Sequence, residues 1–385
     1  MKKLFLHVGH GKTGSSFIQS IFALSSEKLK ENYIIYPEVN NLNRAAQGKI
    51  TSGNGSSLIT LLAAGKNIQD IGGLNYLFSS EVLFHDMLND KSDYLLSSLN
   101  KQDFECIEIL LFIRDPIDHA SSSYQQSIKR GGGTKSIDDF FATYSQPKLV
   151  HEFIQKVNAY DKVNLTIRNY SNRKDDLVVM VANWLNIESS SLMLPKIENV
   201  NRSLTRAELF LQKEFNQHFG RSGNLIADPL CEELPKIKSE SIRPDEKVQL
   251  NMLSRLYQEI EEVNAILDED QDKYSRVALN ETQHSCKEVI FEKSQIKVFV
   301  RSIARELKKP SQKSVGFNNS STLKTSVQKK FQQDPADVFR NMAIAFEHTG
   351  DFEMAYKFML EANKVRPNGK VIRNKLELYK QKIKS

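Results

Sequence analysis

The stretch Leu6–Gln19 reads LHVGHGKTGSSFIQ, in which an apolar run passes directly into a loop rich in glycine and hydroxyl side chains. Residues 4–8 predict a buried central strand, and the residues from Gly14 onward place apolar side chains at helical spacing. A strand, a glycine-rich loop and a helix in this order bring free backbone N–H groups and the positive end of the helix to one point. The stretch therefore predicts an α/β fold with an anion site at the loop. The alternative is a tight turn into a helix that holds no ligand.

The spacing of this loop differs from that of a nucleoside triphosphate site. A P-loop reads G-x-x-x-x-G-K-[ST], so the run Gly11-Lys12-Thr13 would need a glycine at position 6, where Leu6 stands. A standard triphosphate cradle is therefore not expected. Lys12 still supplies a mobile positive charge, and three hydroxyl donors follow it: Thr13, Ser15 and Ser16.

Three further apolar runs extend the predicted sheet. They span residues 74–79, 107–113 and 163–168, and the second (IEILLFI) is uninterrupted, as expected of a strand covered on both faces. Strands that alternate with helices predict a P-loop-like parallel sheet flanked by helices, with right-handed crossovers. Helices are expected at residues 116–128, 150–160, 175–185 and 244–267.

Composition and charge describe an ordinary globular chain with an unusual tail. The 385 residues are 40% hydrophobic and 26% charged, which fits one large domain with an appendage. After position 300 the chain has 18 Lys and Arg against 8 Asp and Glu, whereas the whole chain carries +6, so the first 300 residues are slightly acidic. We therefore expect no nucleic-acid partner for the main domain. The basic tail is interpreted as a solvated helical surface, and the alternative is a surface that attracts nucleic acid, an acidic polysaccharide or an anionic membrane.

The composition changes sharply after the main domain. Residues 308–330 are polar and rich in Ser and Lys, which predicts a linker between an α/β domain with a helical extension (1–307) and an all-α appendage (331–385). Small residues and a turn glycine in the appendage resemble a single tetratricopeptide unit, followed by a capping helix at 370–382. A plain helical hairpin is the alternative. Because one such unit buries its apolar face poorly, we expect it to dock on the main domain or on a protein partner.

The cysteines and the first residues bear on the compartment. Cys106, Cys231 and Cys286 are far apart and lack metal-ligand spacing, so reduced thiols in the cytoplasm and no metal site are predicted. The apolar run near Met1 is too short for a signal peptide. No segment approaches the roughly 18 apolar residues of a membrane span, so no transmembrane segment is expected.

A second motif, FIRDPIDHASSSYQQ at residues 112–126, follows the strongest strand. Arg114 leaves the end of that strand, and Ser122 comes eight residues later in the predicted helix. The carboxyl ends of parallel strands meet at one rim, where ligands usually bind. An arginine fork and a hydroxyl there suit a second phosphate. Two phosphate sites on one rim predict a nucleotide phosphorylated at two places.

Together the two motifs resemble those of the sulfotransferases that use 3′-phosphoadenosine-5′-phosphosulfate. That family's first loop, similar to G-x-x-K-T-G-T-T, contacts the 5′-phosphosulfate, and its R-[DN]-P motif, followed by Ser and Tyr on a helix, contacts the 3′-phosphate. This chain departs from the pattern with Ser15-Ser16 in place of Thr-Thr and with His10-Gly11 where a proline often stands. Residues 125–132 and 201–204 resemble bacterial members that act on surface glycans. The resemblance covers about residues 1–220.

The resemblance implies transfer of a sulfonate group to a hydroxyl or amine acceptor, with Lys12 stabilising the departing phosphate oxygen. Glu81 is the expected base, His10 is its competitor, His85 and His119 come after them, and a helix-capping role is the alternative for Glu81. No metal is expected. The residues expected to hold the nucleotide are Gly11, Lys12, Thr13, Gly14, Ser15, Ser16, Arg114 and Ser122, with Arg202 as a further candidate. A P-loop-like kinase and a catalytically inactive nucleotide-binding protein are the alternative functions.

Overall fold

The protein is described by a computed structural model that divides into two compact units, residues 1–309 and 310–385. The expected linker at 308–330 lies outside the described residues except for its first residue, as do Asn201 and Cys286. The described ranges are 2–37, 53–68, 73–89, 93–195, 202–279, 291–308, 335–348 and 350–384.

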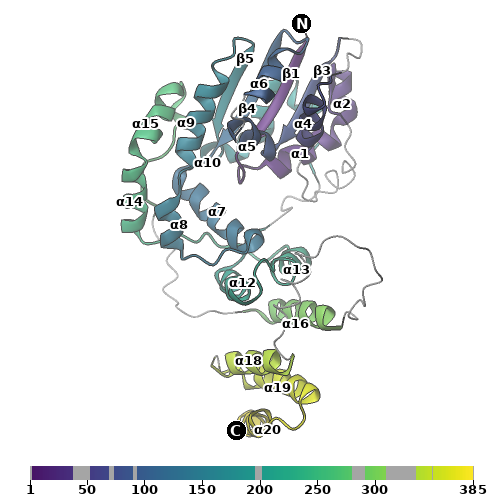
Figure 1. Ribbon diagram of the computed structural model, residues 1–385, viewed down its shortest axis with the longest axis vertical. Coiled ribbons are helices and arrows are strands. Elements are labelled where there is room, and N and C mark those ends of the chain that lie inside the picture. The colour runs from purple at the N-terminus through teal and green to yellow at the C-terminus, as the bar shows by residue number, and fades with distance from the viewer. Residues whose placement is uncertain are drawn as a thin grey trace. The chain divides into compact units, whose positions relative to one another are not determined.

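The first unit is built on one parallel sheet of five strands in the order β2-β3-β1-β4-β5, with β1 in the centre (Figure 1). The predicted α/β class with a parallel sheet is therefore confirmed. The strands are β1 (Lys3–Gly9), β2 (Ile34–Ile35), β3 (Asn75–Ser80), β4 (Cys106–Ile113) and β5 (Val163–Asn169). The edge strand β2 was not predicted, because a two-residue strand is too short to show a period.

Helices cover both faces of the sheet and make two apolar cores. Alternate residues of β4 point to opposite faces: Ile109 and Leu111 join one core, whereas Leu110 joins the other. One core is lined by α1 (Ser15–Leu24), α2 (Ser26–Glu31) and α11 (Leu177–Leu185). The other is lined mainly by α4 (Gly55–Ala63), α5 (Glu81–Asn89), α6 (Tyr94–Asn100), α9 (Gln146–Val157) and α15 (Tyr257–Ile266).

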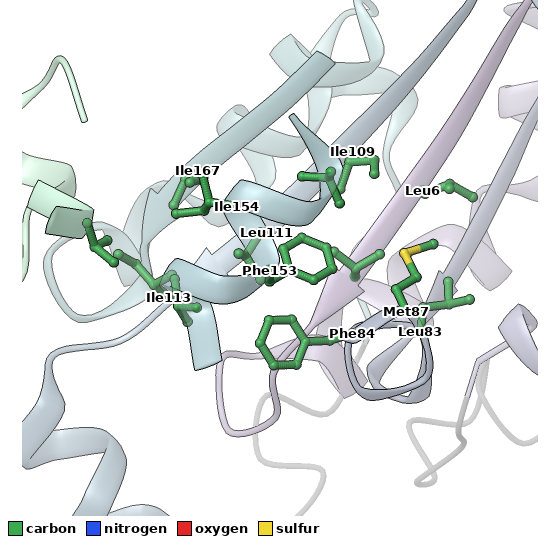
Figure 2. Packing of buried hydrophobic residues seen from close by; sticks show 14 of the residues in the cluster. Leu6, Leu83, Phe84, Met87, Ile109, Leu111, Ile113, Phe153, Ile154 and Ile167 are labelled. Carbon is green, nitrogen blue, oxygen red and sulfur yellow. The ribbon is translucent and has the colours of Figure 1, made fainter. Parts of the chain in front are cut away.

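Figure 2 shows how closely this second core is filled. The rings of Phe84 on α5 and Phe153 on α9 have centroids 4.9 Å apart, next to Leu111 of β4. All three side chains are fully buried. Close packing of this kind fixes α5 against the sheet, and α5 begins at a residue of the predicted site, Glu81.

The remaining helices of the first unit lie beyond the carboxyl ends of the strands or beside the sheet. They are α7 (Pro116–Gly131), α8 (Ile137–Thr143), α10 (Tyr170–Arg173), α12 (Arg206–Phe219), α13 (Ala227–Glu233), α14 (Glu246–Arg255) and α16 (Lys293–Lys308), with 3₁₀ turns at Lys174–Asp176, Ser189–Ser191 and Asp270–Asp272. The single helix expected at 244–267 is two helices, because Leu256 leaves helical geometry at φ −98° and ψ 11°.

The second unit contains α18 (Pro335–His348), α19 (Phe352–Val365) and α20 (Lys370–Lys384), so the C-terminal helices are present. Phe346 and Phe358 stack with centroids 5.2 Å apart and planes 7° from parallel. The hydroxyl of the buried Tyr379 on α20 donates to Glu347 at 2.7 Å. Whether these helices serve as a tetratricopeptide-like partner site stays a prediction. None of the helices within the described ranges is both long and apolar enough to cross a membrane.

Candidate functional site

The loop between β1 and α1 has a left-handed backbone at three positions. Gly11 and Gly14 have φ of 82° and 84°, and Lys12 between them has φ of 55°, which is unusual for a residue with a side chain. A side chain at Gly14 would also collide with the ring of Tyr170, 2.9 Å from a built Cβ. Gly11 and Gly14 are therefore needed for the course of this loop.

The loop leaves its polar groups unsatisfied. The backbone N–H groups of residues 13–16 make no hydrogen bond to any described residue. The hydroxyl oxygens of Thr13 and Ser15 are buried and also lack a partner within the described chain. Buried polar groups are normally paired, so unpaired donors that converge on one helix start indicate a place for an anion. Ser16 lies beside them, partly buried at the first turn of α1.

Lys12 is the cation of this loop. Its pKa is lowered to about 8, mainly by burial and then by the positive charges of Lys129 and Arg114, while Glu81 acts in the opposite direction. The ammonium makes no hydrogen bond or ion pair within the described residues. A partly buried ammonium without a counterion is costly, and an anionic ligand would relieve that cost.

Arg114 joins the second motif to the first. It follows β4, and its Nη1 donates to the backbone carbonyl of Lys12 at 3.0 Å. Its guanidinium carbon lies 5.6 Å from the ring centroid of Tyr170. Its Nε is buried and has no partner within the described part of the chain. The structure therefore brings Lys12 and Arg114 together, and the guanidinium retains N–H donors that could bind a ligand.

The residue after Arg114 has a structural role. Asp115 Oδ1 accepts hydrogen bonds from Asn169 Nδ2 at 2.8 Å and from the backbone N–H of Ser275 at 3.0 Å. Pro116 then begins α7, as expected for proline in a first helical turn. This anchoring fixes the direction in which α7 leaves the sheet. Ser122 lies about two turns into that helix, partly buried and without a hydrogen bond among the described residues.

The acidic candidate lies at the same rim. Glu81 begins α5 directly after β3, and its Cγ would be 3.5 Å from a Cβ built on Gly9. Val8 and Ser80 are in register across β1 and β3, which explains why the two strand ends coincide. Glu81 is partly buried, whereas His85, one turn further on α5, is exposed.

Two buried histidines lie at the loop: His10 belongs to it, and His119 contacts it from α7. The rings of His10 and His119 have centroids 4.5 Å apart and are nearly perpendicular. Both ring nitrogens of His10 lack a partner within the described residues. Burial lowers the pKa of His10 to about 4 and holds the pKa of His119 well below its ordinary value. Both rings are therefore neutral at pH 7, and the low pKa makes His10 a weaker base than an ordinary imidazole.

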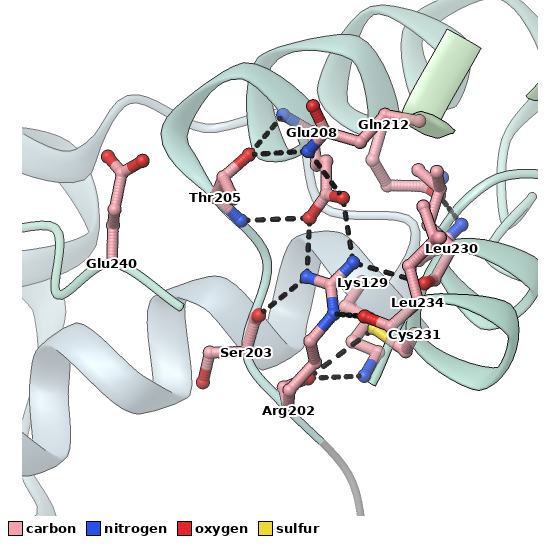
Figure 3. A network of polar contacts seen from close by, with 12 residues as sticks. Lys129, Arg202, Ser203, Thr205, Glu208, Gln212, Leu230, Cys231, Leu234 and Glu240 are labelled. Atoms are coloured by element: carbon pink, nitrogen blue, oxygen red, sulfur yellow. Dashed lines mark hydrogen bonds and ion pairs between the residues drawn. The ribbon is translucent and has the colours of Figure 1, made fainter. Parts of the chain in front are cut away.

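Arg202 is placed differently from the expectation that it contacts phosphate. Its side chain is buried in a network around Glu208 (Figure 3). Nη1 and Nη2 donate to the two oxygens of Glu208 at 2.7 and 2.8 Å. The other three N–H groups donate to the backbone carbonyls of Ser203, Leu230 and Leu234. All five donors are used, so Arg202 stabilises the region around α12 and has no donor left for a ligand in this arrangement. Its phosphate role stays a prediction that this geometry does not support.

A small pocket opens beside Lys12, between α7 and the segment that follows residue 201. It is lined by Lys12, Gln125, Gln126, Lys129, Arg202, Ser203 and Leu204. The buried Oε1 of Gln125 has no partner in the described chain. Lys129 donates from its Nζ to the carbonyl of Arg202 at 3.1 Å, which holds the two walls together.

Sequence reasoning missed Tyr170, whose ring lies over Gly14 and near Arg114. It follows the end of β5, so the rule that ligands bind at the carboxyl ends of parallel strands, which led to Arg114, would also have found it.

No group of three metal-ligating side chains occurs within the described ranges. No protein-family model matches the sequence, and no curated protein matches it.

Proposed function

We propose that this chain is a sulfotransferase that transfers the sulfonate group of 3′-phosphoadenosine-5′-phosphosulfate to a hydroxyl or amine, most simply one on a bacterial glycan. The observation that carries the proposal is the contact between Arg114 and the carbonyl of Lys12. It joins a loop suited to one phosphate and an arginine suited to another. A nucleotide with phosphates at its 5′ and 3′ positions fits such a pair, and AMP or ATP does not use both.

The donor groups of the chain support this fit. The hydroxyls of Thr13 and Ser15 and the Nε of Arg114 are buried without partners among the described residues. The N–H groups of residues 13–16 are also unpaired. A bound phosphosulfate and a 3′-phosphate would satisfy groups that otherwise cost free energy.

The proposed reaction divides its work among three residues. The bond between sulfur and the bridging phosphate oxygen breaks, a bond forms between sulfur and the acceptor atom, and adenosine 3′,5′-bisphosphate leaves. Lys12 stabilises the negative charge that grows on the departing oxygen, as fixed donors do in related transfers. Glu81 accepts the proton of the acceptor group. His10 is the competing base, and its low pKa counts against it.

The pocket beside Lys12, about 10 Å³ in volume, is too small to hold a sugar, so the proposed place for the acceptor is the surface at the mouth of this pocket. Two glutamine amides and Ser203 line it. Amides and hydroxyls both donate and accept hydrogen bonds, which suits the hydroxyl groups of a sugar.

The thiols of Cys106 and Cys231 are free. The proposal therefore places the protein in the cytoplasm, where thiols stay reduced.

The direct test is transfer of radiolabelled sulfonate from the donor to a panel of bacterial surface glycans, with adenosine 3′,5′-bisphosphate measured as the second product. Labelled glycan and nucleotide should appear in equal amounts, and Lys12→Ala should lower both about a hundredfold or more. Transfer of phosphate from ATP that needs Mg²⁺ would instead favour a kinase.

A further inference from the structure

His119 on α7 contacts the loop between β1 and α1, at which an anion is proposed to bind. Its Nε2 lies 3.3 Å from the backbone carbonyl oxygen of Gly11, and its Nδ1 lies 2.9 Å from the hydroxyl of Tyr144 and 3.4 Å from that of Ser123. The ring is buried, with 3% of its surface exposed. A buried imidazole with a fixed partner at each nitrogen has one orientation and is well placed to hold whatever it contacts.

The partners also determine which nitrogen carries the proton. A carbonyl oxygen can only accept, so the contact with Gly11 requires a hydrogen on Nε2. Burial keeps the ring neutral by lowering the pKa of His119, so Nδ1 has no hydrogen and accepts from the hydroxyl of Tyr144. Tyr144, at the end of α8, thus favours the tautomer that donates to the loop, and the more distant hydroxyl of Ser123 acts in the same direction.

The contacted loop has a backbone that needs such support. Gly11 and Lys12 are consecutive left-handed residues, and this conformation is unfavourable for a residue with a side chain. Such backbones persist where neighbouring groups fix them. The carbonyl of Gly11 is held by His119, and the carbonyl of Lys12 is held by Arg114. In a planar trans peptide the N–H points opposite to the C=O. The N–H groups of Lys12 and Thr13 are therefore turned away from these two side chains.

We infer that His119 is a positioning residue: held by Tyr144 as its Nε2–H tautomer, it fixes the Gly11–Lys12 peptide so that the loop is preformed for an anion. The inference rests on the proposed function insofar as that anion is the 5′ group of the nucleotide. The hydrogen bond and the tautomer belong to the free protein, so they can be measured without any ligand.

The first test compares two substitutions of His119 in the full chain. His119→Gln keeps an N–H near the position of Nε2, whereas His119→Leu keeps the volume and removes the donor. By calorimetry, His119→Leu should bind adenosine 3′,5′-bisphosphate about five- to tenfold more weakly than the wild type, as for one lost hydrogen bond, and His119→Gln should stay within about threefold. His7→Gln is the matched control, because His7 is equally buried but contacts Ser79 instead of the loop.

The second test reads the tautomer by nitrogen NMR of protein labelled at its eight histidines. The His119 signals, assigned by their loss in His119→Gln, should show the Nε2–H form at pH 7. Tyr144→Phe combined with Ser123→Ala removes both hydroxyls beside Nδ1, so the share of the other tautomer should rise and nucleotide affinity should fall. An Nδ1–H form in the wild type would overturn the inference, as would wild-type affinity in His119→Leu. A wild type that binds no nucleotide contradicts the proposed function instead, and the NMR result then decides the inference.

Discussion

The guanidinium of Arg114 donates a hydrogen bond to the backbone carbonyl of Lys12 across 102 positions of sequence. This contact makes the loop after β1 and the motif after β4 parts of one site. It also means that Arg114 has two tasks, because one nitrogen supports the loop while the others remain available. Substitution of Arg114 should therefore weaken binding of both the 5′ group and the 3′-phosphate of the nucleotide.

Arg114→Ala should weaken binding of adenosine 3′,5′-bisphosphate by about tenfold to a hundredfold, since a hydrogen bond to a charged group contributes roughly 1.5–3 kcal/mol. The preference for this nucleotide over AMP should shrink at the same time. Arg114→Lys should recover only part of the affinity, because an ammonium cannot reproduce the planar fork. Arg276→Ala, which removes an arginine paired with Glu261 on α15, is the control. An unchanged ratio of the two affinities in Arg114→Ala would mean that Arg114 does not meet the 3′-phosphate.

The pKa of Lys12 predicts a pH dependence of nucleotide binding. Because burial lowers this pKa to about 8, the free protein loses the charge of Lys12 as the pH rises through 8. An anionic nucleotide binds the protonated form better, so affinity should fall above pH 8 in the wild type and stay flat in Lys12→Ala between pH 7 and 9. Turnover of Lys12→Ala should fall about a hundredfold or more. A wild-type affinity that does not change across this range would show that Lys12 is not the titrating contact.

Glu81→Gln separates proton transfer from nucleotide binding. The amide has the shape of the carboxylate but cannot take the acceptor's proton, so turnover should fall by about 10²–10⁴-fold while nucleotide affinity survives. Asn89→Ala, an exposed change on the same helix, is the control. If Glu81→Gln turns over normally and His10→Ala does not, the base is His10. Lost nucleotide affinity in Glu81→Gln would indicate a structural carboxylate.

The buried pair of Arg202 and Glu208 should matter for stability. Arg202→Ala leaves a buried carboxylate unpaired and should lower the free energy of unfolding by about 3–5 kcal/mol, and adding Glu208→Gln should recover part of this loss. Nucleotide affinity of the folded protein should stay within about threefold. A stable Arg202→Ala variant with greatly reduced nucleotide affinity would restore the phosphate role that the structure argues against.

The same pair predicts acid sensitivity. Burial alone would raise the pKa of Glu208, but its hydrogen bonds, above all those from Arg202, hold the pKa below the ordinary value. This contribution is therefore present above the ordinary carboxyl pKa and is lost as the pH falls through the lowered one. Thermal unfolding of the wild type from pH 6 down to 3 should show this loss, and Glu208→Gln should show less of it.

Removal of residues 310–385 should leave nucleotide affinity nearly unchanged. Every residue of the candidate site lies in the first unit. Turnover on a glycan or solubility should fall instead, if the basic helices serve an acceptor or a partner. Calorimetry on the truncated and full chains decides this, and a large loss of nucleotide affinity would mean that the C-terminal helices complete the site.

The sheet could be predicted from the sequence because its signals are local. The run at 107–113 is apolar on both faces of the strand, and each predicted strand falls within about a residue of its observed bounds. The strand β2 could not be predicted because two residues are too few to show a period. The break at Leu256 could not be predicted because the apolar pattern continues through it.

The positions of the site residues that directly follow strands could be predicted from the sequence. The hydrogen-bond partners that come from distant segments could not. Lys12, Glu81 and Arg114 follow three strands that meet at one rim, so the rule for parallel sheets places them together. The state of Arg202 depends on Glu208 and on three backbone carbonyls that only the folded chain brings to it. Gly11 and Tyr144, two of the three partners of His119, likewise come from distant segments, which no local pattern reveals.

The central claim is that this rim holds a nucleotide with two separate phosphates, and titration calorimetry of the wild type tests it most directly. Adenosine 3′,5′-bisphosphate should bind without Mg²⁺ and at least about tenfold more tightly than AMP or ATP, because only it can meet both the loop at Lys12 and the guanidinium of Arg114. Equal affinity for AMP, or binding of ATP that requires Mg²⁺, would contradict the account.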